Sequence, residues 1–192
     1  MSQYIKIPKE RIAVLIGPNG AVKKLLEEKS GAEITINSDD GSVEVREGED
    51  PLAALRCVEV IRAVARGFNP EKAIELFYDD MLMLDIIDLS DVASTPKELL
   101  RLKGRIIGKD GKTRDIAERL INVKISVYGK TVSVLGHPEQ TEIIRTAVDM
   151  LVNGVNHGTV YGFLEKKHEE LMKAQANDDG YDLLYTEDDF KY

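Results

Sequence analysis

The chain has 192 residues, of which 43% are apolar, and a formal net charge of −8. This apolar content is ordinary for a protein that forms a core, and there is no run of about 18 apolar residues, so we expect a soluble, cytoplasmic protein without a membrane span. The single cysteine, Cys57, excludes an internal disulfide and a multi-cysteine zinc site, and its apolar surroundings predict that it is buried.

Residues 1–67 predict a folded unit with the order strand, helix, helix, strand, strand, helix. Apolar residues with a period of two indicate strands, and those with a period of about 3.6 indicate helices. We expect a strand over 4–7, helices over 8–16 and 20–30, strands over 32–37 and 42–46, and a helix that starts at Pro51 and ends at Gly67. Asp50 caps this last helix, and Leu55, Val58 and Ile61 belong to its apolar stripe.

Residues 68–80 predict a helical linker, because Asn69-Pro70 is a typical helix start and the segment lacks the glycine and serine of a flexible coil. Residues 81–154 predict a second unit that repeats the first. Its expected elements are a strand over 81–89, a helix opened by a capping box from Thr95 to Glu98, a helix over 111–121, strands over 123–128 and 130–135, and a helix from Pro138 to Val152. A C-terminal helix over 155–175 follows, and then an acidic tail over 176–192 that we expect to be disordered.

The two units form an internal repeat that becomes visible when Gly17 is superposed on Gly108. The superposition matches the apolar residues on both sides of the loop: Leu15-Ile16 with Ile106-Ile107, and Ile34 and Ile36 with Ile125 and Val127. Agreement in phase with the expected helices and strands is hard to obtain by chance. We therefore expect an α+β fold with two tandem modules, each a three-stranded sheet packed against three helices.

Each repeat has a G-x-x-G loop at the start of a helix. Because glycine has no Cβ, the backbone can approach a phosphate closely there, and the helix N-terminus favours an anion. We therefore predict that the loops bind the phosphates of RNA. The candidate residues are Gly17, Pro18, Asn19, Gly20, Lys23 and Lys24 around the first loop, and Arg105, Ile107, Gly108, Lys109, Asp110, Gly111, Lys112, Arg114 and Ile125 around the second, where the two isoleucines would face bases.

The negative net charge disfavours binding to phosphates until its distribution is considered. Basic residues outnumber acidic residues over 103–130, which contains the second loop, whereas 68–91 and 175–192 are acidic. Local charge decides where an RNA backbone can lie. We therefore expect the second loop to be the stronger phosphate site, while the ligand of the first loop, RNA or protein, stays open.

Other chemistries fit the sequence poorly. Gly111-Lys112-Thr113 resembles the end of a nucleotide-binding Walker A loop, but Ile106 stands where that loop requires a glycine. The three histidines are scattered, and neither histidine nor cysteine spacing matches a zinc site. We expect no enzymatic activity, no metal and no cofactor.

The residues resemble those of the tandem KH small-subunit ribosome assembly factors, the partners of the Nob endonuclease in archaea and eukaryotes. The resemblance covers about residues 1–170 and rests on 104–113, on Val134-Leu135-Gly136 and on Gly158-Thr159-Val160-Tyr161. It implies two type I KH modules, each of which holds about four nucleotides of single-stranded RNA. It also implies binding near the 3′ end of small-subunit rRNA, where the protein recruits or assists the Nob-type endonuclease that matures this end.

Both glycines of the first loop are present, whereas eukaryotic relatives look degenerate there, which favours an archaeal-type member. Two alternatives stay open: the related Krr-type assembly factor, which is also a tandem KH protein, and a KH scaffold that binds mainly protein and has weak affinity for RNA. For the acidic tail, which carries Tyr181, Tyr185, Phe190 and Tyr192, the alternative to disorder is docking on a basic partner or on the RNA groove of the chain itself.

Overall fold

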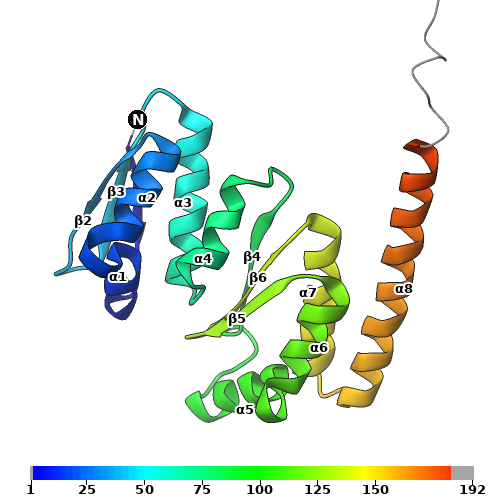
Figure 1. The fold of residues 1–192 in the computed structure, drawn as a ribbon. Coiled ribbons are helices and arrows are strands. Elements are labelled where there is room, and N and C mark those ends of the chain that lie inside the picture. Colours follow the sequence, from blue (N-terminus) through cyan, green and yellow to red (C-terminus); the bar gives the residue numbers. More distant parts are fainter. Residues whose placement is uncertain (1, 183–192) are drawn as a thin grey trace, which may run out of the picture.

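The computed structural model describes residues 2–182, and the surroundings of side chains as far as residue 176. Two units of the same topology follow each other along the chain, and a long helix comes after the second (Figure 1). Each unit has one antiparallel three-stranded sheet with helices packed against it. The predicted α+β fold with two tandem modules is therefore confirmed.

The first module contains the six expected elements and a short 3₁₀ turn at its loop. They are β1 (Ser2–Lys6), α1 (Lys9–Ile16), the turn η1 (Pro18–Gly20), α2 (Ala21–Ser30), β2 (Glu33–Ile36), β3 (Ser42–Arg46) and α3 (Pro51–Ala65). β3 is the central strand and runs antiparallel to both neighbours, with Ile34 opposite Val45. Leu15, Leu26 and Ile61, one from each helix, are fully buried and join the helices to the sheet.

The last helix of this module begins as predicted, but its buried face differs. The Asp50 carboxylate caps α3 by accepting hydrogen bonds from two N–H groups of the first turn, at 2.9 and 3.2 Å. Val58 and Ile61 are buried, whereas Leu55 is 45% exposed, so its assignment to the apolar stripe was wrong. Cys57 is buried as expected, and this burial raises the pKa of its thiol to about 11.

The linker is helical, as predicted, and the second module repeats the topology of the first. The linker contains α4 (Pro70–Ala73) and the 3₁₀ turn η2 (Ile74–Phe77). The second module contains β4 (Met83–Asp88), α5 (Pro96–Ile107), the turn η3 (Lys109–Gly111), α6 (Lys112–Ile121), β5 (Lys124–Tyr128), β6 (Thr131–Gly136) and α7 (Pro138–Val152). The capping box of α5 forms only in part: Thr95 accepts from the Glu98 N–H at 3.2 Å, but the Glu98 carboxylate bonds to Ser94.

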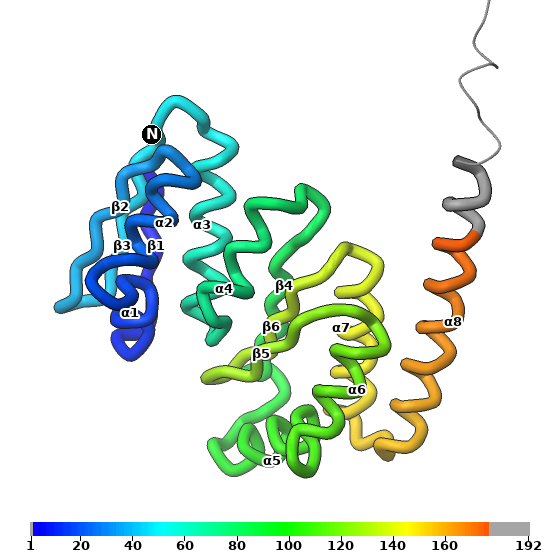
Figure 2. The backbone as a smooth tube through the Cα atoms, viewed as in Figure 1, coloured from blue at the N-terminus to red at the C-terminus, as the bar shows by residue number. Residues whose placement is uncertain are grey.

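The second sheet is covered on both faces. Its strand order is β4-β6-β5, and its own helices cover one face, while α3, α4 and η2 lie against the other (Figures 1 and 2). Every residue of the central strand β6 is buried. Val132 and Val134 belong to the core of the second module, but Leu135, on the opposite face, belongs to the core of the first. The two modules therefore share apolar packing, which fixes them relative to each other.

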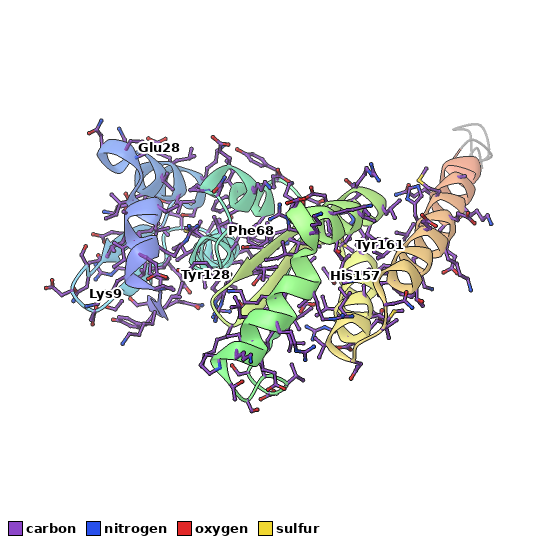
Figure 3. The ribbon with its side chains drawn as sticks, turned by 90° about the horizontal axis from the view of Figure 1, so that it is seen from below. Lys9, Glu28, Phe68, Tyr128, His157 and Tyr161 are labelled. Carbon is purple, nitrogen blue, oxygen red and sulfur yellow. The ribbon has the colours of Figure 1, made fainter. Side chains whose placement is uncertain are left out.

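Polar contacts hold the edge strand β5 against the first module. The Ser126 hydroxyl donates to the carbonyl group at the end of α3, at 2.8 Å, and Lys124 forms an ion pair with the linker. Tyr128 bonds through its hydroxyl to Glu10 of α1, and the Arg11 guanidinium lies 5.8 Å from the centre of the Tyr128 ring (Figure 3). Alternate residues of β5 therefore face the first module, and the residues between them face the helices of the second.

The last described helix, α8 (His157–Asp182), packs against α6 and α7. Val160 and Leu164 are buried in this contact, and ring nitrogens of His157 and His168 lie 2.9 and 2.7 Å from backbone carbonyl oxygens of α5 and α6. The helix continues past its expected end at residue 175 to Asp182, and the rest of the tail, for which we expected disorder, lies outside the described residues. Of the described helices, none has the length and apolar character needed to cross a membrane.

Gly67 allows the close contact between α3 and β5. Its φ is +97°, and an added Cβ would lie 2.6 Å from the Ser126 hydroxyl oxygen and 2.9 Å from the Tyr128 Cβ. Gly154 stands at the equivalent place after α7, with a φ of +86° and no atom within 4 Å of an added Cβ. We expect Gly67→Ala to lower the free energy of unfolding by about 2–4 kcal/mol, and Gly154→Ala by only about 1 kcal/mol, because the second change adds strain without a clash.

Urea unfolding of the two variants measures this difference. Equal losses of stability would contradict the tight docking of β5 on the first module.

Candidate nucleic-acid interface

Both glycine loops have the same backbone conformation. The first and last glycines have φ angles of 73° and 76° in the first loop, and of 77° and 78° in the second. The residue before the last glycine is also left-handed, with a φ of 53° at Asn19 and 54° at Asp110. Asn and Asp adopt this conformation more readily than other residues with a side chain. The two loops therefore have the same shape although their middle residues differ.

The two glycines of each loop have different roles. A Cβ on Gly17 would lie 2.4 Å from the Val22 side chain, and a Cβ on Gly108 would lie 2.2 Å from the Thr113 hydroxyl oxygen. The last glycine has more space: a Cβ there meets nothing within 4 Å in the first loop, and nothing closer than 3.6 Å at Gly111. The first glycine thus holds the loop against the next helix, and the last one leaves the outer surface open.

The backbone donors of the two loops are not equivalent. In both, the N–H of the last glycine donates to the carbonyl of the first, at 3.2 Å for Gly20 and 3.3 Å for Gly111. α2 and α6 start directly afterwards, so the positive end of each helix dipole lies at a loop. Lys109 has a backbone N–H, whereas Pro18 at the same place has none. The second loop therefore has one backbone donor that the first lacks.

The side-chain cations also favour the second loop. Lys109 and Lys112 are exposed, and within the part of the chain that the structure describes neither forms a hydrogen bond or an ion pair. Arg114 is partly buried, with its guanidinium 3.3 Å from the Asp115 carboxylate and 3.9 Å from that of Glu118. Two exposed cations without a described partner and one paired cation thus surround the second loop.

The first loop has a more apolar environment. Its own variable residues are Pro18 and Asn19, and Lys23 of the next helix lies 3.5 Å from the Glu27 carboxylate, which leaves the exposed Lys24. A depression of about 460 Å³ beside the loop is lined by α1, by Pro18, by the start of α2 and by the linker. A site of this kind attracts a phosphate backbone less strongly than the second loop does.

In the second module α8 approaches the same region. The hydroxyl groups of Thr113 and Tyr161 lie 2.9 Å apart, and the Nε2 atom of His157 lies 2.9 Å from the carbonyl oxygen of Arg105 (Figure 3). α8 thereby supports the helix that follows the second loop. The sequence pattern predicts the helix over 155–175, but it does not predict the contact of this helix with the second loop.

Arg105 does not point into the expected phosphate site. Its Nε donates to the carbonyl of Leu151 at 2.9 Å, and its Nη2 donates to that of Val155 at 2.6 Å. The guanidinium thus caps the C-terminal end of α7 and the turn that follows it, where the helix dipole favours a cation. Arg11 of the first module makes the equivalent pair of bonds at the end of α3, at 2.8 and 2.7 Å. Because its donors are used in this way, we no longer expect Arg105 to contact a phosphate.

The two isoleucines that were expected to face bases near the second loop differ in how deeply they are buried. Ile107 is partly buried, whereas the Ile125 side chain is only 8% exposed and belongs to the core. Ile125 lies on the edge strand β5, which has β6 on one side only. What this strand offers to a ligand is therefore its backbone edge more than the Ile125 side chain.

One glutamate in each module was missed by sequence reasoning. Oε1 of Glu118 accepts a hydrogen bond from the Ile125 N–H at 2.7 Å, and Oε1 of Glu27 accepts one from the Ile34 N–H at 2.9 Å. Each glutamate thus joins the helix after the loop to the edge strand of the same module. The signal was available, since the two glutamates occupy the same position in the repeat.

These features define the class of protein. Each module has the order strand, helix, helix, strand, strand, helix, with a G-x-x-G loop between its first two helices and an open edge strand nearby. This is the architecture of the type I KH module, which binds single-stranded nucleic acid. Within residues 2–176, no three His, Cys, Asp or Glu side chains are grouped as a metal site would require.

Comparisons with known proteins identify the family. Residues 2–63 match the KH domain, and residues 83–169 match the eukaryotic type KH-domain, KH-domain type I. A KH domain-containing protein of Methanocaldococcus jannaschii is 42% identical, with 90% of this chain and 77% of that protein covered. The pre-rRNA-processing protein PNO1 of Saccharomyces cerevisiae is 30% identical, with 90% of this chain and 65% of that protein covered.

Solved structures agree with the sequence matches. Dim2p of Pyrococcus horikoshii superposes with a TM-score of 0.80 at 44% identity, over 86% of this chain and 99% of that one. Dim2p in a complex with a/eIF2α and rRNA, also from P. horikoshii, superposes with a TM-score of 0.82 at 43% identity, over 88% and 95%. The chain belongs to the Dim2/PNO1 family of tandem KH ribosome assembly factors. These names favour that family over the Krr-type alternative.

The different places of Arg105 and Lys112 lead to opposite expectations for their alanine variants. Arg105→Ala removes the hydrogen bonds to the Leu151 and Val155 carbonyls and should lower the free energy of unfolding by about 1–3 kcal/mol. Lys112→Ala should leave stability within about 0.5 kcal/mol, because the exposed side chain has no described partner. If Lys112 contacts a phosphate, its loss should also reduce the salt dependence of RNA binding by about 0.7 in the log–log slope.

Unfolding curves and binding titrations at several salt concentrations test both variants. A normal stability of Arg105→Ala, together with a reduced salt slope, would return Arg105 to the phosphate site.

Proposed function

We propose that this protein binds single-stranded RNA through its second module, near the 3′ end of the small-subunit rRNA. The second loop carries the proposal: Gly111 leaves its outer surface open, and Lys109 and Lys112 are exposed beside it at the N-terminus of α6. A phosphate there would meet backbone N–H groups, the helix dipole and two ammonium groups. The rRNA in the complex of P. horikoshii Dim2p supports this choice of ligand.

The bases of such an RNA would lie along β5. An edge strand has unpaired backbone groups on its outer side, and β5 runs beside α6, which starts at the second loop. About four nucleotides fit between the loop and the strand in a KH module. The phosphate loop would thus fix the position of the RNA strand along the module, and the groups along β5 would contact its bases.

The protein acts without catalysing a reaction, as the KH proteins of this family are RNA-binding assembly factors. In our proposal it recruits or assists a Nob-type endonuclease that matures the 3′ end. A protein bound near this end would lie beside the bond that the endonuclease cleaves. The resemblance of residues 104–113 and 158–161 to the partners of that endonuclease supports this role.

The first module is the candidate for a different contact, with protein. Lys23 is already paired with Glu27, Pro18 offers no N–H, and an apolar depression lies beside the loop. The presence of a/eIF2α in the complex of P. horikoshii Dim2p supports a protein partner for this kind of chain. In this proposal the second module binds RNA, and the first module binds protein and contributes little to RNA affinity.

A charge placed at the open glycine tests the second loop. Gly111→Asp puts a carboxylate where the phosphate would lie, while Gly111→Asn places a neutral group of the same shape there, and both residues tolerate the left-handed backbone. We expect Gly111→Asp to weaken binding of a single-stranded oligonucleotide from the rRNA 3′ end by roughly tenfold or more relative to Gly111→Asn.

The same pair of variants at Gly20 serves as the control in the first module. The difference between Gly20→Asp and Gly20→Asn should be less than about threefold if that module contributes little to RNA affinity. Equal affinities of the two Gly111 variants would contradict a phosphate at the second loop.

Crosslinking to small-subunit precursors tests the location of the site. We expect the crosslinked nucleotides to lie near the 3′ end of the small-subunit rRNA. Crosslinks confined to other regions of the rRNA would contradict this part of the proposal without affecting the KH fold.

A further inference from the structure

The segment Gly158-Thr159-Val160-Tyr161 forms the start of α8, and one of its residues reaches the second loop. The hydroxyl oxygen of Tyr161 lies 2.9 Å from that of Thr113. His157 lies one turn earlier on the same face of α8, with its ring centre 6.2 Å from that of Tyr161 and its Nε2 atom 2.9 Å from the Arg105 carbonyl oxygen (Figure 3). α8 therefore contacts the last turn of α5 and the first turn of α6, the two helices that the second loop joins.

The Thr113 hydroxyl is a buried polar group, since this residue is only 3% exposed. Burial of a hydroxyl costs free energy unless it forms a hydrogen bond, and among the described residues Tyr161 is its partner. The first module has Val22 at the equivalent position, where it packs on Gly17 as Thr113 packs on Gly108. Both side chains branch at Cβ, so the packing of the loop does not require a hydroxyl. In the second module the hydroxyl adds a bond to α8.

Thr113 stands where a change of position would affect the loop. It is the second residue of α6, and its backbone nitrogen would lie 2.8 Å from a Cβ on Gly108. The first N–H groups of a helix have no partner within the helix and are the groups that meet a bound anion. At the other end of α6, Nδ1 of His168 lies 2.7 Å from the carbonyl oxygen of Leu120. α8 thus holds α6 at both ends, and the Tyr161 hydroxyl makes the bond at the end that faces the loop.

We propose that Tyr161 is a positioning residue for RNA binding: through Thr113 it holds the second loop and the N-terminus of α6 in the conformation that binds a phosphate. This inference rests on the proposed binding of single-stranded RNA by the second module. A bond that restricts the loop before RNA arrives lowers the entropic cost of binding, so its contribution appears in the affinity. Val22 has no hydroxyl and cannot form such a bond in the first module.

A double-mutant cycle separates positioning from a direct contact with RNA. Thr113 is too deeply buried to touch RNA itself, so a loss of affinity in Thr113→Val reports on the bond to Tyr161. Tyr161→Phe removes the same bond from the other side. We expect each variant to weaken binding by roughly threefold to tenfold, and the double variant to bind no more weakly than either. A direct contact of Tyr161 with RNA would instead make the two losses multiply.

The stability of the same variants separates positioning from a general structural role. Tyr161→Phe leaves the buried Thr113 hydroxyl without its partner and should lower the urea midpoint of unfolding. The double variant replaces both hydroxyl groups by apolar groups of similar shape, so it should recover most of this midpoint. Its affinity for RNA should nevertheless stay low. An affinity that recovers together with the midpoint would mean that the bond only stabilises the fold.

The experiment titrates the full chain with a single-stranded oligonucleotide from the 3′ end of the small-subunit rRNA at several salt concentrations. Thr113→Ser keeps the hydroxyl and should bind as the wild type does. Tyr4→Phe is the control in the first module, where it removes a hydroxyl bonded to Glu44 at 3.1 Å, and it should not change the affinity. The salt dependence should be the same in Thr113→Val and Tyr161→Phe as in the wild type, because neither change removes a cation.

The outcomes distinguish the inference from the function on which it rests. A wild-type chain that binds the oligonucleotide, with a similar loss of affinity in both single variants and in the double variant, supports the inference. Unchanged affinity in Thr113→Val, losses that multiply, or a recovery of affinity in the double variant overturns the inference and leaves the RNA-binding function standing. A wild-type chain that binds no RNA would overturn the proposed function and the inference with it.

Discussion

The left-handed backbone at the first glycine of each loop is the constraint on which the RNA-binding face depends. At Gly108 a Cβ would lie 2.2 Å from the Thr113 hydroxyl oxygen, so the loop can close on the next helix only if this residue is glycine. That closure places the start of α6 directly behind the loop and leaves Gly111 on the outside. The place proposed for the phosphate, at the N-terminus of α6, and the position of Glu118, seven residues after Gly111 on the same helix, both follow from it.

The packing between the modules makes the two repeats unequal. The second sheet is buried on both faces, because the first module and the linker cover the face that points away from its own helices. Contacts of Ser126 and Tyr128 then hold the edge strand β5 in place. A strand that is fixed in this way can present its outer edge to a ligand at little entropic cost. The first module has the same loop, but Lys23 is paired with Glu27 and Pro18 has no backbone N–H, so fewer groups there can bind a phosphate.

The fold could be predicted from the sequence to a large extent, because the apolar pattern is repeated in phase and the glycines, prolines and caps mark the ends of elements. Predictions failed where a long side chain or a packing partner decides. Arg105 was expected at the phosphate because of its neighbours in sequence, but its guanidinium donates to the carbonyl groups of Leu151 and Val155, at and just after the end of α7. Leu55 fits the apolar spacing of α3, but it lies on a part of the helix surface that remains exposed. The bond of Glu118 to Ile125 was missed because it exists only after the strand returns beside the helix, and the one signal for it was the matching position of Glu27 in the repeat.

The central claim is that the second loop, and not the first, holds the RNA backbone. The most direct measurement is an NMR titration of the backbone amides with a single-stranded oligonucleotide from the 3′ end of the small-subunit rRNA. We expect the largest chemical-shift changes over residues 108–113 and along β5, with much smaller changes over 17–22. Changes that are largest at the first loop, or that leave 108–113 unaffected, would contradict the account.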